Sequence, residues 1–259
     1  MGKIKGSFEY LLKEGLTKKQ AKAAFDAVKI QVVNTYYQNN LSKMFNFALD
    51  NDTSLFTVLS FEENDDLEKM AKEYLIKWCK GYERDRDNPA LKRPLKTYGE
   101  EDAALIERIA SNTQADEKTI NNYMLGHLLF MSAENMNGSI LEEYLAEVLE
   151  PYGWIWCAGA TFRAIDFCHL GEETILLQVK NKYNTENSSS SAIRSGTTIK
   201  KWNRLSRPRA ATGKYKPLPN WGKLRELVHA NKNLELMLTE EKYLEYISKN
   251  STRKLETSN

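Results

Sequence analysis

The sequence predicts an α/β fold in which a mostly helical N-terminal region precedes a mixed central sheet flanked by helices. Three observations support this prediction. Apolar residues recur at helical spacing over most of the first 115 residues, three short apolar runs follow between residues 154 and 180, and a helical pattern closes the chain at 239–250. With 259 residues, the chain is long enough to bury one large core.

The N-terminal region is expected to contain helices over residues 17–49 and 60–85, where apolar residues follow the helical period. Thr17 is a suitable N-cap for the first of these helices. Ser60 is expected to begin the second, because acidic residues that suit the helix dipole follow it. Residues 84–102 are polar and contain prolines, which is typical of a connector.

A helical pattern over residues 116–154 is expected to form one or two helices, broken near residues 137–138 and ended by Pro151. Short runs at 154–160, 162–168 and 174–180 predict strands, and 169–173 predicts the hairpin turn between the last two. A further strand is expected at 233–238. We therefore place a helical region at 1–115 and a core at 116–259.

Composition narrows the class of protein. The chain is 41% hydrophobic and 28% charged, as in ordinary globular proteins, and it contains no apolar run long enough to span a membrane. No continuous hydrophobic segment follows the N-terminal lysines, so we expect no secretory signal. Cys79, Cys157 and Cys168 are scattered without metal-ligand spacing. These features predict a cytoplasmic protein with buried, reduced thiols and no membrane partner.

Charge is distributed unevenly along the chain. Residues 1–179 contain 20 basic and 28 acidic residues, whereas residues 180–259 contain 17 basic and 7 acidic residues. Ten of those basic residues fall between Lys180 and Lys216, which contain one acid. Such a dense basic segment predicts a surface that follows phosphate groups, in a loop over 180–216. A solvated, lysine-rich loop is the alternative.

The candidate catalytic residues lie at the predicted hairpin. Asp166 ends one apolar run, and Gln178 and Lys180 share one face of the next strand, with Val179 on the other. Together they could form a Mg²⁺ pocket in which oxygen atoms hold the ion and the lysine stabilises charge or orients a water molecule. Glu142, in the preceding helix, could supply another carboxylate. Alternatively, Asp166 makes a turn and Lys180 is surface charge.

This arrangement resembles the PD-(D/E)XK nuclease superfamily. The matching residues are Asp166 for the metal-binding acid, Gln178-x-Lys180 for the last two motif positions, and Glu142 for the helix acid. The resemblance implies catalytic roles for all four residues, with Asp166, Gln178 and Glu142 as ligands of Mg²⁺. Most members have a carboxylate where this chain has Gln178, so another acid must compensate. Glu142 is the first choice, and Glu143 and Glu134 are the others.

The blocks at 131–159, 163–167 and 177–204, with the later PNW at 219–221, are similar to type II restriction endonucleases of the SinI family. The similarity spans about a third of the chain. Residues 1–115 carry no matching motif, and we expect them to clamp double-stranded DNA or to form the dimer. The similarity implies a Mg²⁺-dependent homodimer that cuts both strands of a short near-palindrome of GGNCC or GGWCC type. It also implies functional pairing with a cognate DNA methyltransferase.

Residues of the basic segment are the candidates for DNA binding. Short polar side chains suit contacts with phosphate oxygens, basic side chains supply charge, and arginine is a common reader of guanine. Arg194 and Arg204 are the candidates for reading bases. Trp202 could stack or wedge at a base step, or it could pack under a loop. The full set is Lys182, Asn184, Asn187, Ser188, Ser189, Ser190, Ser191, Arg194, Lys200, Lys201, Trp202 and Arg204.

Two other functions remain open on the sequence. A structure-selective repair or recombination nuclease could carry the same motif with glutamine at position 178. A non-catalytic DNA-binding protein could have lost the acid at that position. A serine nucleophile in the serine run is disfavoured, because no glycine pattern for an oxyanion hole accompanies it.

Overall fold

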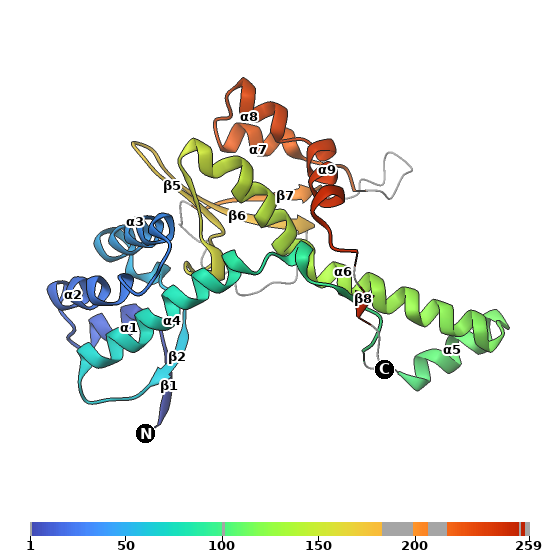
Figure 1. Cartoon of the computed structure of the whole chain (residues 1–259), viewed down its shortest axis with the longest axis horizontal. Helices are drawn as coiled ribbons and strands as arrows, with labels where there is room; N and C mark the ends of the chain where they lie inside the picture. The colour runs from blue at the N-terminus through green and yellow to red at the C-terminus, as the bar shows by residue number, and fades with distance from the viewer. Residues whose placement is uncertain (1, 100–101, 183–198, 207–216, 254, 257–259) are drawn as a thin grey trace. The chain divides into compact units, whose positions relative to one another are not determined.

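The computed structural model describes residues 2–99, 102–182, 199–206, 217–253 and 255–256 (Figure 1). The chain divides into two compact units. The first contains residues 1–88 and 145–239, and the second contains residues 89–144 and 240–259. The long helix α6 (Glu117–Leu149) contributes to both. The units therefore do not follow the expected boundary at residue 115, because the N-terminal helices pack with the sheet in one unit.

The first unit contains a four-stranded mixed sheet in the order β4-β5-β6-β7. Neighbouring strands are antiparallel except for β6 and β7, which are parallel. The expected α/β class is confirmed, and three strands form near the expected runs with different bounds. The first strand ends at Trp156, and the second begins at Phe167 and includes His169 and Leu170, which were expected in the hairpin turn. The strand bounds are β4 (Trp154–Trp156), β5 (Phe167–Leu170), β6 (Thr174–Lys182) and β7 (Lys200–Leu205).

Strand β7 corrects the expectation of an uninterrupted loop over residues 180–216. Its sequence, KKWNRL, is too basic to be recognised as a strand from hydrophobic pattern alone. In the sheet it is the last strand of the order, and edge strands tolerate lysine, which discourages pairing with other chains. Its parallel register aligns Gln178 with Lys201 and Lys180 with Asn203.

The N-terminal part of the first unit consists of helices with a small antiparallel sheet (Figure 1). Aromatic side chains form the core between the helices. Phe25 stacks on Phe45 with ring centroids 4.2 Å apart, and Trp78 lies edge-on to both rings. The elements are β1 (Lys3–Gly6), α1 (Phe8–Lys13), α2 (Lys18–Lys29), α3 (Thr35–Asn51), β2 (Leu59–Glu62) and α4 (Leu67–Asp87).

Helix ends follow local capping chemistry. Thr17 is confirmed as the N-cap of α2, where it forms a capping box with Gln20. The expected start at Ser60 is wrong, since Ser60 lies in β2. Helix α4 begins at Leu67, because the Asp66 side chain accepts hydrogen bonds from the backbone amides of its first turn.

Two further expectations are corrected. Residues 233–238 form most of the helix α8 (Lys232–Met237) instead of a strand, because Asn231 caps it through the Leu234 amide. Helix α6 runs without a break through residues 137–138. Helix α7 (Trp221–Leu227) contacts β7, and the expected closing helix is α9 (Glu240–Asn250). Cys79, Cys157 and Cys168 are buried free thiols, as expected.

A tight turn between β4 and β5 packs against helix α4. Gly159 lies in the 3-10 turn η4 (Ala158–Ala160) with φ +67°, and a Cβ there would lie 2.3 Å from the carbonyl oxygen of Gly81. Only glycine permits this approach without strain. Next to it, the Trp78 indole donates to the Thr161 carbonyl at 2.8 Å. Helix α4 therefore fixes the turn that leads into β5.

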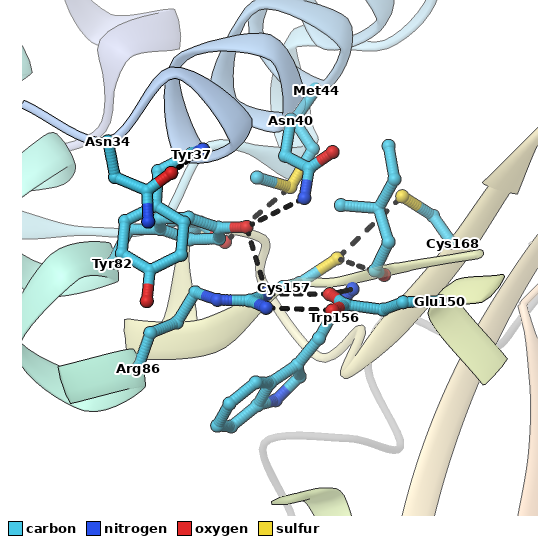
Figure 2. Close-up of polar contacts among 12 residues, drawn as sticks. Asn34, Tyr37, Asn40, Met44, Tyr82, Arg86, Glu150, Trp156, Cys157 and Cys168 are labelled. Atoms are coloured by element: carbon cyan, nitrogen blue, oxygen red, sulfur yellow. Dashed lines mark hydrogen bonds and ion pairs between the residues drawn. The ribbon is translucent and has the colours of Figure 1, made fainter. Parts of the chain in front are cut away.

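A partly buried ion pair adds a second link between α4 and the start of the sheet (Figure 2). The Arg86 guanidinium donates to both oxygens of Glu150 at 2.6 and 2.7 Å, and their side chains are only 10% and 13% exposed. Burial lowers the Arg86 pKa, but Glu150 outweighs it and the net pKa is raised. Four rings surround the guanidinium within 5.5 Å: Tyr36, Tyr37, Tyr82 and Trp156.

The second unit contains residues 117–144 of α6 together with shorter elements. The Glu143 carboxylate, which is buried, accepts a hydrogen bond from the Ala90 amide, and Tyr144 packs on Tyr243 with ring centroids 5.4 Å apart. None of the helices in the described ranges has the length and apolar content of a membrane span. The other elements are β3 (Leu95–Lys96), α5 (Ala103–Thr113), α9 and β8 (Leu255–Glu256), with β3 and β8 parallel.

Replacing Arg86 with methionine is expected to destabilise the first unit by about 3–5 kcal/mol, because Glu150 would remain as an uncompensated, largely buried charge. Urea unfolding followed by tryptophan fluorescence measures this change. Lys22→Met is the matched control, because Lys22 pairs with Asp50 on an exposed surface. Its unfolding midpoint should stay near that of the wild type, and an equal loss in both variants would contradict the prediction.

Candidate active site

Asp166 lies directly before β5, at the point where the chain leaves the turn anchored on α4. Its backbone amide donates to the Leu177 carbonyl at 2.9 Å, and its carboxylate Oδ2 accepts from the Val179 amide at 2.6 Å. The backbone of β6 is thus held on both sides of Gln178. The half-buried carboxylate is therefore directed at the segment that contains Gln178 and Lys180, as the sequence predicts.

Gln178 and Lys180 lie two residues apart in β6, so their side chains share one face of the sheet. Gln178 is buried and Lys180 is half-buried. Burial raises the pKa of Asp166 above its ordinary value, while the Val179 amide and the positive charge of Lys180 act in the opposite direction. The lysine is therefore close enough to stabilise negative charge at the carboxylate.

Strand β7 brings two more side chains to this face, which the sequence analysis did not assign to the catalytic group. In the parallel register, Lys201 lies beside Gln178 and Asn203 lies beside Lys180. The Asn203 Oδ1 atom is buried and has no hydrogen-bond partner in the described part of the chain. An unpaired buried acceptor costs about 1–3 kcal/mol. In the sequence, the one sign of this face was the alternation of two polar residues, Lys201 and Asn203, with the apolar Trp202 between them.

The oxygen atoms of Asp166, Gln178 and Asn203 are of the kind that a hard cation such as Mg²⁺ prefers. The Asn203 Oδ1 atom, which has no hydrogen-bond partner among the described residues, supports the fit of Mg²⁺ to this site. A bound ion or its water would give this atom a partner. The described residues include no group of three or more His, Cys, Asp and Glu side chains suited to a metal ion. Of Asp166, Gln178 and Asn203, Asp166 is the one carboxylate, and the two amide side chains add no charge.

The candidate helix acids belong to the second unit. Glu142 is half-buried and Glu134 is exposed, both on α6. Glu143 holds the Ala90 amide, and burial raises its pKa while hydrogen bonds from the Ala90 and Leu91 amides lower it. Glu143 therefore has a structural role within its own unit. The choice of Glu142 as the compensating acid stays a prediction.

The candidate DNA contacts that the structure describes differ in their exposure to solvent. Lys182 and Lys200 are exposed, and Lys201 is half-buried on the face of Gln178. Trp202 is buried, packs on Trp221 with centroids 5.1 Å apart and donates to the Asn220 carbonyl at 2.8 Å. Trp202 therefore takes the packing role that the sequence left as the alternative to a DNA wedge.

Arg204 is also buried, and its Nε donates to Asn181 Oδ1 at 2.7 Å. This bond joins β7 to the residue after Lys180, so Arg204 positions the end of β6 and does not face solvent as a reader of bases would. The remaining candidates lie outside the described residues: Asn184, Asn187, Ser188, Ser189, Ser190, Ser191 and Arg194.

Comparison with known proteins identifies relatives for most of the chain. A family model described as SinI restriction endonuclease matches residues 26–250. The type II restriction enzyme Eco47I of Escherichia coli is 45% identical over 149 residues, which cover 56% of this chain and 60% of that protein. The type II restriction enzyme SinI of Salmonella infantis is 40% identical over 169 residues, which cover 53% and 73%. The family resemblance predicted from the sequence is confirmed.

The raised pKa of Asp166 predicts a pH dependence of stability in metal-free protein. A carboxyl whose folded pKa is raised loses stability as pH rises from about 4 through that folded pKa. Asp166→Asn removes this loss and keeps an amide oxygen for the Val179 amide. The wild type should therefore become less stable relative to Asp166→Asn as pH rises, in urea unfolding with EDTA present.

Asp66→Asn is the control of opposite sign. Hydrogen bonds from the Lys69 and Glu68 amides lower the Asp66 pKa, so the wild type should gain stability relative to this variant as pH rises. Two difference curves of the same slope would contradict the assignment of a raised pKa to Asp166.

Proposed function

This chain belongs to the SinI restriction endonuclease family, and we propose that it acts as a type II restriction endonuclease. The proposed reaction is hydrolysis of a phosphodiester bond in each strand of double-stranded DNA at a short specific sequence. The match over residues 26–250 carries the proposal. The position of Asp166 beside Lys180, at the end of a sheet with an adjacent basic strand, supports it.

We assign the chemistry to the face of the PD-(D/E)XK-like sheet that bears Gln178 and Lys180. Asp166, Gln178 and Asn203 would hold Mg²⁺, with Glu142 as the proposed additional acid. The ion, when bound, supplies charge stabilisation at the phosphate and lowers the pKa of a water molecule. The Lys180 ammonium would orient the attacking water and stabilise negative charge on the phosphate, and Lys201 would add positive charge beside it.

The finer features of the proposal come from the family resemblance. They are a GGNCC or GGWCC type of site, a homodimer whose two-fold axis follows that of the DNA, and a cognate methyltransferase that protects the host site. Digestion of a mapped plasmid with purified protein, with and without Mg²⁺, tests the activity. Discrete fragments are expected, with ends that report the site.

A non-catalytic DNA-binding protein is the second candidate, favoured by the amide at position 178 and the single carboxylate of the described site. Specific retention of plasmid fragments without turnover in Mg²⁺ or Mn²⁺ would support it. Nicking or cutting of branched substrates without discrete fragments would instead indicate a structure-selective nuclease.

Lys180→Ala and Asp166→Ala are each expected to reduce plasmid cleavage by at least about 1,000-fold, because they remove the proposed transition-state charge and the carboxylate ligand. Binding of a DNA fragment, measured by fluorescence anisotropy in Ca²⁺, should survive in both. Lys223→Ala, at an exposed surface pair on α7, is the control and should cleave normally. A fully active Lys180→Ala protein would refute the assignment.

Asn203→Ala is expected to weaken Mn²⁺ binding about tenfold while leaving metal-free stability unchanged or slightly raised. The variant removes a proposed oxygen ligand together with an acceptor that has no partner among the described residues. Titration calorimetry measures the metal affinity, and urea unfolding in EDTA measures the stability. Asn220→Ala, which alters an amide outside the proposed ligand set, is the control. Unchanged Mn²⁺ affinity in Asn203→Ala would remove this residue from the site.

A further inference from the structure

The second unit exposes an apolar helical surface that the proposed chemistry does not use. Helix α5 buries none of its residues. On α6, Phe130 is 80% exposed and Tyr123 is 51% exposed. Tyr123 and Phe130 are seven residues apart, so they lie on the same side of the helix. Large exposed apolar side chains that gather on one surface mark an interaction site.

This surface differs from the rest of the chain in charge. Residues 119–133 of α6 contain no Asp, Glu, Lys or Arg, although 28% of the whole chain is charged. A DNA-binding surface requires lysine and arginine, so this part of α6 is unsuited to phosphate. A membrane span requires about 20 apolar residues, whereas this run has fifteen and includes Asn121, Asn122 and His127.

An uncharged surface suits a second copy of the same chain. Around a two-fold axis each patch meets its own copy, so any net charge on it would repel itself. Depletion of charge and enrichment of aromatic residues are also the features of the buried centre of protein interfaces. The composition of this helix therefore favours self-association over an acidic or basic partner.

Gly126 gives the pairing a specific geometry. A Cβ at Gly126 would meet nothing within 4 Å among the residues that the structure describes, so their packing does not require glycine there. Glycine inside a helix costs roughly 0.5–1 kcal/mol relative to alanine. Gly126 lies four residues before Phe130, on the same side of the helix. In an antiparallel pair centred near residue 128, Phe130 of each copy would lie over Gly126 of the other.

We propose that α6 pairs antiparallel with α6 of a second copy, with Phe130 packed on Gly126 across the two-fold axis. Centred there, residues 117–139 overlap over about 34 Å. A contact about 10 Å wide over this length would bury about 340 Å² of each copy, or about 700 Å² in total, which lies at the low end of the range for specific interfaces. The proposal deepens the proposed homodimer by assigning its surface.

The test measures the oligomeric state without DNA, by sedimentation velocity of the full chain from about 0.1 to 50 µM. The wild type should be a dimer, and Phe130→Glu should raise its dissociation constant at least about 100-fold. Leu236→Glu changes an apolar residue that is 70% exposed, on α8 in the first unit, and should leave the dimer intact. Circular dichroism checks folding, and Tyr123→Lys serves as a second disrupting variant if Phe130→Glu fails to fold.

Each outcome decides the proposal. Dissociation by Phe130→Glu or Tyr123→Lys, with Leu236→Glu unchanged, supports it. A monomeric wild type, or a dimer that persists in both α6 variants, overturns it. Plasmid cleavage by the wild type is scored separately, so an active enzyme with another dimer surface is distinguished from a chain that has no nuclease activity. Lys180→Ala should remain a dimer while losing cleavage.

Discussion

The close packing of the 158–163 turn against α4 is the constraint on which the candidate site depends. Gly159 meets the backbone of Gly81, Trp78 holds the Thr161 carbonyl, and the Arg163 amide donates to the Leu55 carbonyl at 2.7 Å. These contacts fix the backbone three residues before Asp166. The N-terminal helices thus set the direction of the carboxylate, although they contribute none of the proposed catalytic side chains.

The electrostatics of the site explain how an amide can stand at position 178. Asp166 already has a raised pKa because burial disfavours its charge. A second carboxylate on the adjacent strand would add like-charge repulsion in the absence of a cation. Gln178 and Asn203 offer oxygen atoms without that repulsion, at the cost of weaker attraction for a divalent ion.

The sequence predicted those elements whose own residue pattern is enough to determine their structure. The hairpin that holds Asp166 beside Gln178 and Lys180 follows from two apolar strands and a turn, and Thr17 capped its helix as expected. Strand β7 was missed because an edge strand rich in lysine gains its stability from pairing with β6, which local composition does not reveal. The same pairing buried Trp202 and Arg204, which local composition had placed toward DNA.

Helix α6 shows how one element can serve two purposes through changes in composition along its length. Leu145, Val148 and Leu149, at its C-terminal end, are buried in the first unit. Residues 119–133 are instead uncharged and expose aromatic side chains. Exposure of a phenylalanine to water is unfavourable, and a partner surface of matching shape over Phe130 and Gly126 would remove that cost.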